Sequence, residues 1–217
     1  MKKGLTEIIV VIDKSGSMRD TQQQVIEGFN EFLREQSAQP GEATLTMTQF
    51  NTDYCIVHDG VALADVPALD TKSYCPEGGT ALIDAACRTI DKVTARHANM
   101  PDAEKPERVL MVITTDGQEN SSIENKKDDL KKRVTDLEAA NWRFIFFGAN
   151  IDAFAEAGGY GVQRGATASY KATAQGTRSM YDTISQAALD YRSKGSFTIP
   201  KPGEKPQQEA PEKKGCK

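Results

Sequence analysis

The sequence predicts an α/β fold: a doubly wound, Rossmann-like three-layer sandwich with a mostly parallel sheet and one antiparallel edge strand. Runs of consecutive apolar residues at 8–12 and 109–113 are typical of strands buried on both faces, as in a parallel sheet. Segments with helical spacing of apolar residues, such as 20–37, alternate with these runs and indicate helices on both faces. The short connection between 45–50 and 54–58 permits only an antiparallel hairpin, which we place at the sheet edge.

Helices are expected wherever apolar residues recur at intervals of three or four. The first covers 20–37, and its Asp20–Gln23 pair resembles a capping box. The second carries Asp84 in its first turn, where we expect this residue either to cap the helix or to lie near a metal. The third helix follows a Ser-x-x-Glu capping-box pattern at 121–124.

The remaining elements complete the alternation of strands and helices. A proline-containing loop at 61–79 leads to the second helix, and connections of this length are often functional. A buried strand at 143–150 is followed by a short helix at 151–157 and a short strand near Val162. Residues 180–191 define a final amphipathic helix.

The length of the chain suits one domain. At 217 residues, of which 38% are apolar, the chain would bury about 70% of its unfolded surface. We assign residues 1–195 to this domain. Prolines and scattered charges predict a disordered tail over 196–217, because such a segment has little apolar surface to bury.

Charge and hydropathy exclude several classes of function. The net charge of -4 and the pI near 5.4 argue against a nucleic-acid-binding protein. No run of 18 apolar residues occurs, so we expect no membrane-spanning helix. Residues 1–7 contain two lysines but no long apolar stretch or small-residue cleavage site. We therefore predict a cytoplasmic protein that does not associate with membranes.

The cysteines and histidines form no metal or redox motif. In a protein without a secretory signal the four cysteines are expected to be reduced, and their spacings match no zinc pattern. We expect Cys55 on a strand and Cys87 on a helix to be small buried residues. His58 and His97 show no partner pattern, so we expect surface or structural roles for both.

The most informative stretch follows the apolar run at 8–12. Asp13 ends this run, and Ser15 and Ser17 follow at a spacing of two, with Gly16 between them allowing a tight turn. The carboxyl end of a strand is where open α/β sheets bind ligands. One carboxylate and two hydroxyls that converge there form a hard-oxygen site, which suits Mg²⁺ or Mn²⁺.

These residues resemble the D-x-S-x-S motif of the von Willebrand factor A (VWA) domain family. The Gly78–Thr80 segment resembles the G-G-T loop of that family, and Thr115–Gly117 resembles the T-D-G end of its strand. The resemblance covers roughly residues 5–195 and is strongest with stand-alone intracellular proteins of bacterial or phage type. It implies a metal-ion-dependent adhesion site (MIDAS) for Mg²⁺ or Mn²⁺, with the following ligands: Asp13, Ser15, Ser17, Thr80 and Asp116.

The resemblance implies a binding function rather than catalysis. In the family, a Glu or Asp of a protein partner supplies a further oxygen to the metal. We therefore expect a protein-binding module that is a monomer alone, is not an enzyme, and works with a partner such as an ATPase or stress-response complex.

Two alternatives stay open. A metal-dependent phosphotransferase or hydrolase could use an aspartate nucleophile after the first strand. The haloacid dehalogenase-like family, however, has D-x-D there, and this chain carries Ser15 at the second acidic position. No P-loop pattern occurs either. The second alternative is a structural assembly protein in which the metal site is not essential.

Overall fold

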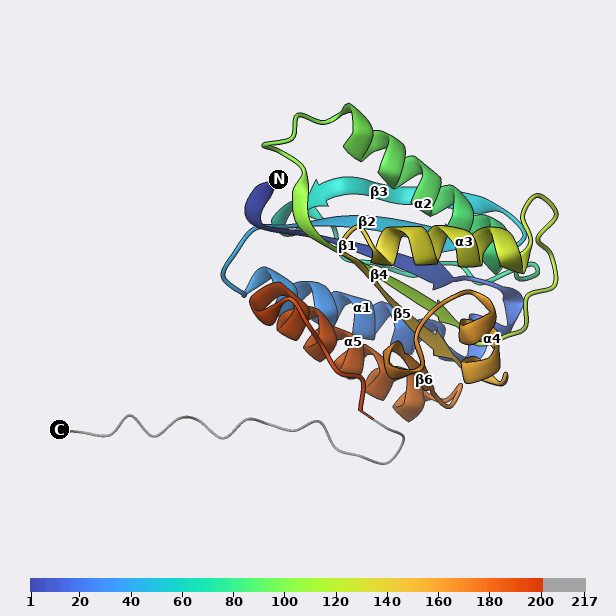
Figure 1. The fold of residues 1–217 in the computed structure, drawn as a ribbon. Coiled ribbons are helices and arrows are strands. Elements are labelled where there is room, and N and C mark those ends of the chain that lie inside the picture. Colours follow the sequence, from blue (N-terminus) through green and yellow to red (C-terminus); the bar gives the residue numbers. More distant parts are fainter. Residues whose placement is uncertain (201–217) are drawn as a thin grey trace.

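Six strands form one sheet in the computed structural model, which describes residues 1–200 (Figure 1). The strands are β1 (Lys2–Asp13), β2 (Ala43–Phe50), β3 (Tyr54–Ala62), β4 (Pro106–Thr115), β5 (Trp142–Gly148) and β6 (Thr167–Ser169). Their order across the sheet is β3-β2-β1-β4-β5-β6. Neighbouring strands are parallel except β2 and β3, which form an antiparallel hairpin at one edge. The predicted fold class is confirmed.

Helices cover both faces of this sheet. The α-helices are α1 (Gln22–Ser37), α2 (Leu82–Asn99), α3 (Lys127–Glu138), α4 (Ala153–Gly159) and α5 (Ala174–Lys194). Short 3-10 helices occur at η1 (Gly16–Thr21), η2 (Leu63–Asp65) and η3 (Arg164–Ala166). Helices α1 and α5 pack on one face, and α2, α3 and α4 pack on the other (Figure 1). Within residues 1–200, none of these helices combines the length and apolarity needed to span a membrane.

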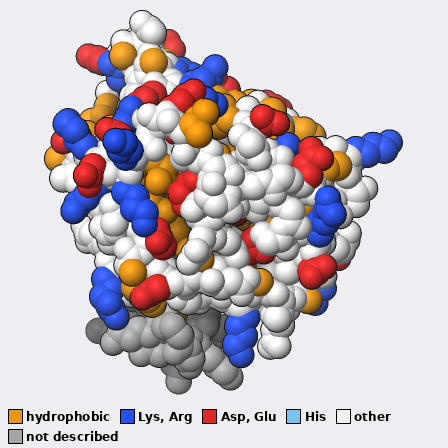
Figure 2. Space-filling model, turned by 90° about the vertical axis from the view of Figure 1, so that its right-hand side faces the viewer, with side chains coloured by type: hydrophobic (Ala, Val, Ile, Leu, Met, Phe, Trp, Pro, Cys, Tyr) orange, Lys and Arg blue, Asp and Glu red, His pale blue; other side chains and the backbone are white. Residues whose placement is uncertain are grey.

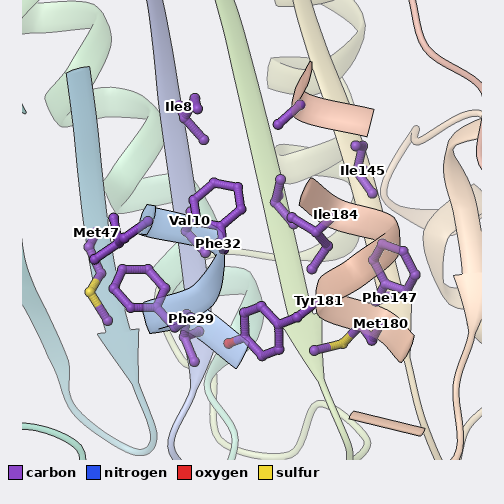
Figure 3. Packing of buried hydrophobic residues seen from close by; sticks show 14 of the residues in the cluster. Ile8, Val10, Phe29, Phe32, Met47, Ile145, Phe147, Met180, Tyr181 and Ile184 are labelled. Atoms are coloured by element: carbon purple, nitrogen blue, oxygen red, sulfur yellow. The ribbon is translucent and has the colours of Figure 1, made fainter. Parts of the chain in front are cut away.

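The central strand β1 is buried on both faces because its successive side chains alternate between two cores. Ile8, Val10 and Ile12 belong to the core beneath α1 and α5, and Figure 3 shows aromatic rings of these helices packed around this part of the sheet. Ile9 and Val11 belong to the core beneath α2, α3 and α4. A strand covered in this way needs apolar residues at every position, as the sequence has at 8–12.

The chain leaves β1 and β4 toward opposite faces of the sheet. β1 leads to α1 on one face, whereas β4, its neighbour in the sheet, leads to α3 on the other face. Ligands of open α/β sheets bind outside the carboxyl ends of the strands at such a point. We therefore expect a ligand site beyond Asp13 and Thr115, the last residues of these two strands.

The predicted capping box at the first helix is wrong. Helix α1 begins at Gln22, and its N-cap residue Thr21 makes no side-chain cap. The residues before it form η1, in which the Met18 N–H donates to the Ser15 carbonyl at 3.0 Å. Because the loop after Asp13 turns directly into this 3-10 helix, Asp20 lies inside η1 and is not in a capping position.

The predicted capping box at 121–124 is also wrong. Helix α3 begins at Lys127, where Asp129 Oδ2 accepts a hydrogen bond from the Lys126 N–H at 2.8 Å. The serines of the predicted box are held elsewhere, because Glu119 Oε1 accepts the N–H groups of Ser121 and Ser122 at 2.9 and 2.8 Å. The segment 117–126 is therefore a loop with its own hydrogen bonds.

The strand predicted near Val162 lies instead at β6. The Val162 N–H donates to the Ala157 carbonyl at 2.9 Å, which closes the end of α4 and prevents an extended conformation. Strand β6 begins five residues later and pairs with residues 146–148 of β5.

The first residues of the predicted tail pack on the domain. The Phe197 ring meets Tyr191 of α5 edge to face, with centroids 6.0 Å apart, and Ile199 is buried in the same core. The packed part of the chain therefore extends past residue 195, at least as far as Ile199. The rest of the predicted tail, 201–217, lies outside the described residues.

The cysteines divide between the core and the surface. Cys87 is buried on α2, as predicted, but Cys55 is exposed, because the edge strand β3 is only partly covered. Cys75 is exposed as well, and Cys216 lies outside the described residues.

Glu7, in the middle of β1, is a buried charge that the sequence analysis missed. Its carboxylate accepts hydrogen bonds from Thr46 Oγ1 and His97 Nε2, both at 2.6 Å, and forms an ion pair with Arg96. Burial opposes ionisation, but these partners outweigh it and hold the pKa of Glu7 below its ordinary value. His97 of α2, for which no partner was expected, thus has one on β1, which this helix packs against.

We expect Glu7→Gln to lower the free energy of unfolding at pH 7 by about 3 kcal/mol, because it leaves Arg96 without its buried partner. A depressed carboxyl pKa stabilises the fold above the ordinary value of 4.5, and this stabilisation is lost as the pH falls through the folded-state pKa. The difference between variant and wild type should therefore shrink only below pH 4.5. Urea unfolding at several pH values measures it, with exposed Glu104→Gln as control. A difference independent of pH would contradict this account.

Candidate metal centre

Asp13 lies at the carboxyl end of β1 with its side chain fully buried. One carboxylate oxygen, Oδ1, accepts the Ser15 N–H at 2.7 Å, and the other, Oδ2, accepts Thr115 Oγ1 at 2.6 Å. Its backbone carbonyl accepts the Tyr74 hydroxyl at 2.6 Å. Ser15 and Thr115 therefore fix the carboxylate, and Tyr74 fixes the backbone that carries it.

A chain of hydroxyls links the β1 loop to the end of β4. Ser15 Oγ and Ser17 Oγ lie 3.1 Å apart, and Ser17 Oγ donates to Asp116 Oδ1 at 2.5 Å. Asp116 follows the last residue of β4 and is buried, whereas Ser17 is exposed. The site therefore opens to solvent on the Ser17 side.

Thr80 reaches the same point from a third loop. A Cβ added to Gly117 would lie 3.7 Å from both Thr80 Oγ1 and Ser17 Oγ, so these two hydroxyls border the same space. The Gly16 N–H donates to the Gly78 carbonyl at 3.0 Å, which fastens the loop of Thr80 to the serine loop. Gly78 has φ of +73°, a conformation that other residues rarely adopt.

The structure thus brings all five sequence-predicted ligands together at the carboxyl edge of the sheet. It also adds residues that sequence reasoning did not select. Thr115 and Tyr74 hold Asp13, and Asn150 Nδ2 donates to the Asp116 carbonyl at 3.1 Å. Thr115 is the threonine of the recognised T-D-G pattern, which is a usable signal. Tyr74 carries none, because its partner is 61 residues away in the chain.

The two carboxylates lack compensating positive charge. Within residues 1–200, neither Asp13 nor Asp116 forms an ion pair with a basic side chain. Burial raises the pKa of Asp13 to about 6, with a further contribution from the nearby charge of Asp116, and burial raises the pKa of Asp116 as well. Such a pair is suited to a divalent cation.

The donor set fits a hard metal ion. Two carboxylates and three hydroxyls supply only oxygen ligands, which Mg²⁺ and Mn²⁺ prefer. The described part of the chain contains no group of three or more His, Cys, Asp or Glu placed to hold a metal, so a metal at this edge would need the hydroxyl ligands as well. Gly117 leaves the space in front of the Thr80 and Ser17 hydroxyls free of a side chain.

The family model of the von Willebrand factor type A domain matches residues 7–157, well over half of the chain. The protein therefore belongs to this family. No curated protein matches the sequence.

Solved structures share the fold at low sequence identity. Proximal thread matrix protein 1 (PTMP1) from the mussel byssus has a TM-score of 0.60 at 13% identity over 84% of this chain and 48% of its own. Manganese-loaded TRAP protein of Plasmodium vivax has a TM-score of 0.55 at 18% identity, over 79% of this chain and 70% of its own. The ArnB paralog VWA2 from Sulfolobus acidocaldarius has a TM-score of 0.51 at 15% identity, over 86% of this chain and 45% of its own. This chain thus spans about half the length of the mussel protein.

We expect Asp13→Asn to stabilise the metal-free protein. The pKa of the Asp13 carboxyl is about 6 in the folded state and 3.8 ordinarily, so the folded state binds the carboxyl proton more tightly than the unfolded state does. The wild type therefore loses stability as the pH rises through 6. The stability gained by the variant should grow from nearly zero near pH 4 to at most about 3 kcal/mol above pH 7. Urea unfolding in chelator measures this gain. Equal stability of variant and wild type at pH 7.5 would show that burial of the charged carboxylate does not destabilise the fold.

Proposed function

We propose that this protein is a metal-dependent protein-binding module, in which Mg²⁺ or Mn²⁺ captures an acidic side chain of a protein partner. The observation that carries the proposal is the convergence of two buried, uncompensated carboxylates with three hydroxyls at the carboxyl edge of the sheet. The residues that would hold the metal are Asp13, Ser15, Ser17, Thr80 and Asp116.

The chemistry of these ligands favours capture of an anion. Neutral hydroxyls donate less charge than carboxylates, so a bound divalent metal keeps a net affinity for one more anionic ligand. Ser17 is exposed, which leaves a route for a partner carboxylate from that side. A PTMP1 structure has a zinc-occupied MIDAS motif, and the TRAP structure is manganese-loaded, which supports a metal at the equivalent place here.

We propose binding rather than catalysis. The hydroxyls of Ser15 and Ser17 contact each other and Asp116, and within residues 1–200 no histidine, lysine or cysteine side chain contacts them as a base would. A structural assembly role with a non-essential metal is the remaining alternative. A cytoplasmic location, a monomeric state and an ATPase or stress-response partner stay predictions.

Titration calorimetry with Mg²⁺ and Mn²⁺ tests the proposal. We expect binding by the wild type and none by Asp13→Ala, because this change removes a fixed carboxylate ligand. Ser17→Ala should weaken binding less, since water can replace a neutral hydroxyl. Metal at 100 times its Kd should stabilise the wild type by about 2.7 kcal/mol and leave Asp13→Ala unchanged.

Asp128→Ala, an exposed carboxylate on α3, is the matched control and should bind metal as the wild type does. Equal metal affinity of Asp13→Ala and wild type would contradict the proposed site. Metal binding by the wild type without any metal-dependent binding of acidic peptides would favour the structural alternative.

A further inference from the structure

Ile123 is an exposed apolar residue in an unusual position. Its side chain is 90% exposed, and among residues 1–200 the other large exposed hydrophobic residue is Met1. A single exposed apolar side chain is common on protein surfaces and by itself indicates nothing. The surroundings of Ile123 are what distinguish it.

The loop that carries Ile123 is fastened to the metal centre. The Thr80 carbonyl accepts the N–H groups of Asn120 and Ser121 at 3.0 and 3.2 Å, and the Thr80 N–H donates to Asn120 Oδ1 at 2.9 Å. Ile123 follows Ser121 by two residues, a span of at most about 7 Å. Ile123 therefore lies on the rim of the candidate site, in the loop between β4 and α3 at the right of Figure 1.

Asp84 of α2 holds the tip of this loop. Its Oδ2 accepts the N–H groups of Ile123 and Glu124 at 2.7 and 3.1 Å, and Oδ1 accepts the Asn125 N–H at 2.7 Å. Burial opposes ionisation, but these hydrogen bonds outweigh it and keep the pKa of Asp84 below its ordinary value. The carboxylate thus does not cap α2, one of the two roles expected from the sequence, because its oxygens are taken up by this loop.

Glu119 holds the first half of the loop in the same way. Its Oε1 accepts the N–H groups of Ser121 and Ser122, and its Oε2 accepts Ser122 Oγ at 2.7 Å and the Ile83 N–H at 2.8 Å. Two carboxylates therefore fix the backbone on both sides of Ile123. An apolar residue whose backbone is already fixed loses less conformational freedom on binding, which suits an interface anchor.

The surrounding surface offers neutral polar groups. Figure 2 shows the face at the carboxyl edge of the sheet, where the middle is mostly white with some Asp and Glu side chains, and the Lys and Arg side chains lie largely around the margin. The charge nearest in the chain to Ile123, that of Glu124, is paired with Arg88 and is thus compensated within the protein. We infer that Ile123 is an apolar anchor of the partner-binding surface, and that the partner presents an acidic side chain beside an apolar recess that receives Ile123.

This inference rests on the proposed function, and selected peptides test both. Random peptides displayed on phage are bound to the full-length protein in Mg²⁺ and eluted with chelator. We expect the eluted peptides to combine Glu or Asp with large apolar residues. Synthetic copies of them should bind Ile123→Ser at least tenfold more weakly than wild type and Ile123→Leu within twofold.

Ile123→Ser should keep the fold and the metal affinity, because the Ile123 side chain is exposed and only its N–H is held. Unchanged melting temperature and Mg²⁺ titration verify this point. Chelator-eluted peptides that bind wild type and Ile123→Ser equally would overturn the anchor and leave the proposed function intact. Peptides that bind Asp13→Ala as well as wild type would overturn the proposed function, and the inference with it.

Discussion

The burial of β1 on both faces is the constraint on which the rest of the structure depends. β1 pairs with β2 on one side and with β4 on the other, and helices cover its two faces. The end of β1 is therefore fixed by its neighbours in the sheet and by the helices on both faces. Asp13, its last residue, has a well-defined position as a result. Parallel pairing with β4 then brings Asp116 to the same edge, because parallel strands end on the same side.

The buried carboxylates of this protein have three different kinds of partner. Glu7 has a guanidinium and an imidazole as partners, and Asp84 has the backbone N–H groups of a loop. Both keep their charge at a depressed pKa. Asp13 and Asp116 have mainly hydroxyl partners and raised pKa values, so their charge is not compensated by the protein. Among these four carboxylates, only Asp13 and Asp116 carry negative charge that the protein does not compensate. They lie side by side at the candidate metal centre, which opens toward solvent.

The loops around the site support one another. The loop of Thr80 is fastened to the serine loop through Gly16 and Gly78, and to the 117–126 loop through Asn120. A ligand that contacts Thr80 therefore contacts a residue whose hydrogen bonds also hold the loop of Ile123. This shared set of hydrogen bonds gives the candidate metal centre and its rim a common geometry.

Local sequence determined much of this protein. The five consecutive β-branched apolar residues before Asp13 indicated a strand buried on both faces, and the spacing of Ser15 and Ser17 indicated oxygen ligands, because both signals arise within a few adjacent residues. Only the tertiary structure decided the partners of Glu7 and His97, the roles of Tyr74 and Asp84, and the true start of α3. The physical reason is that these features depend on hydrogen bonds between segments far apart in the chain, whose energies compete with local capping and turn preferences and here exceed them.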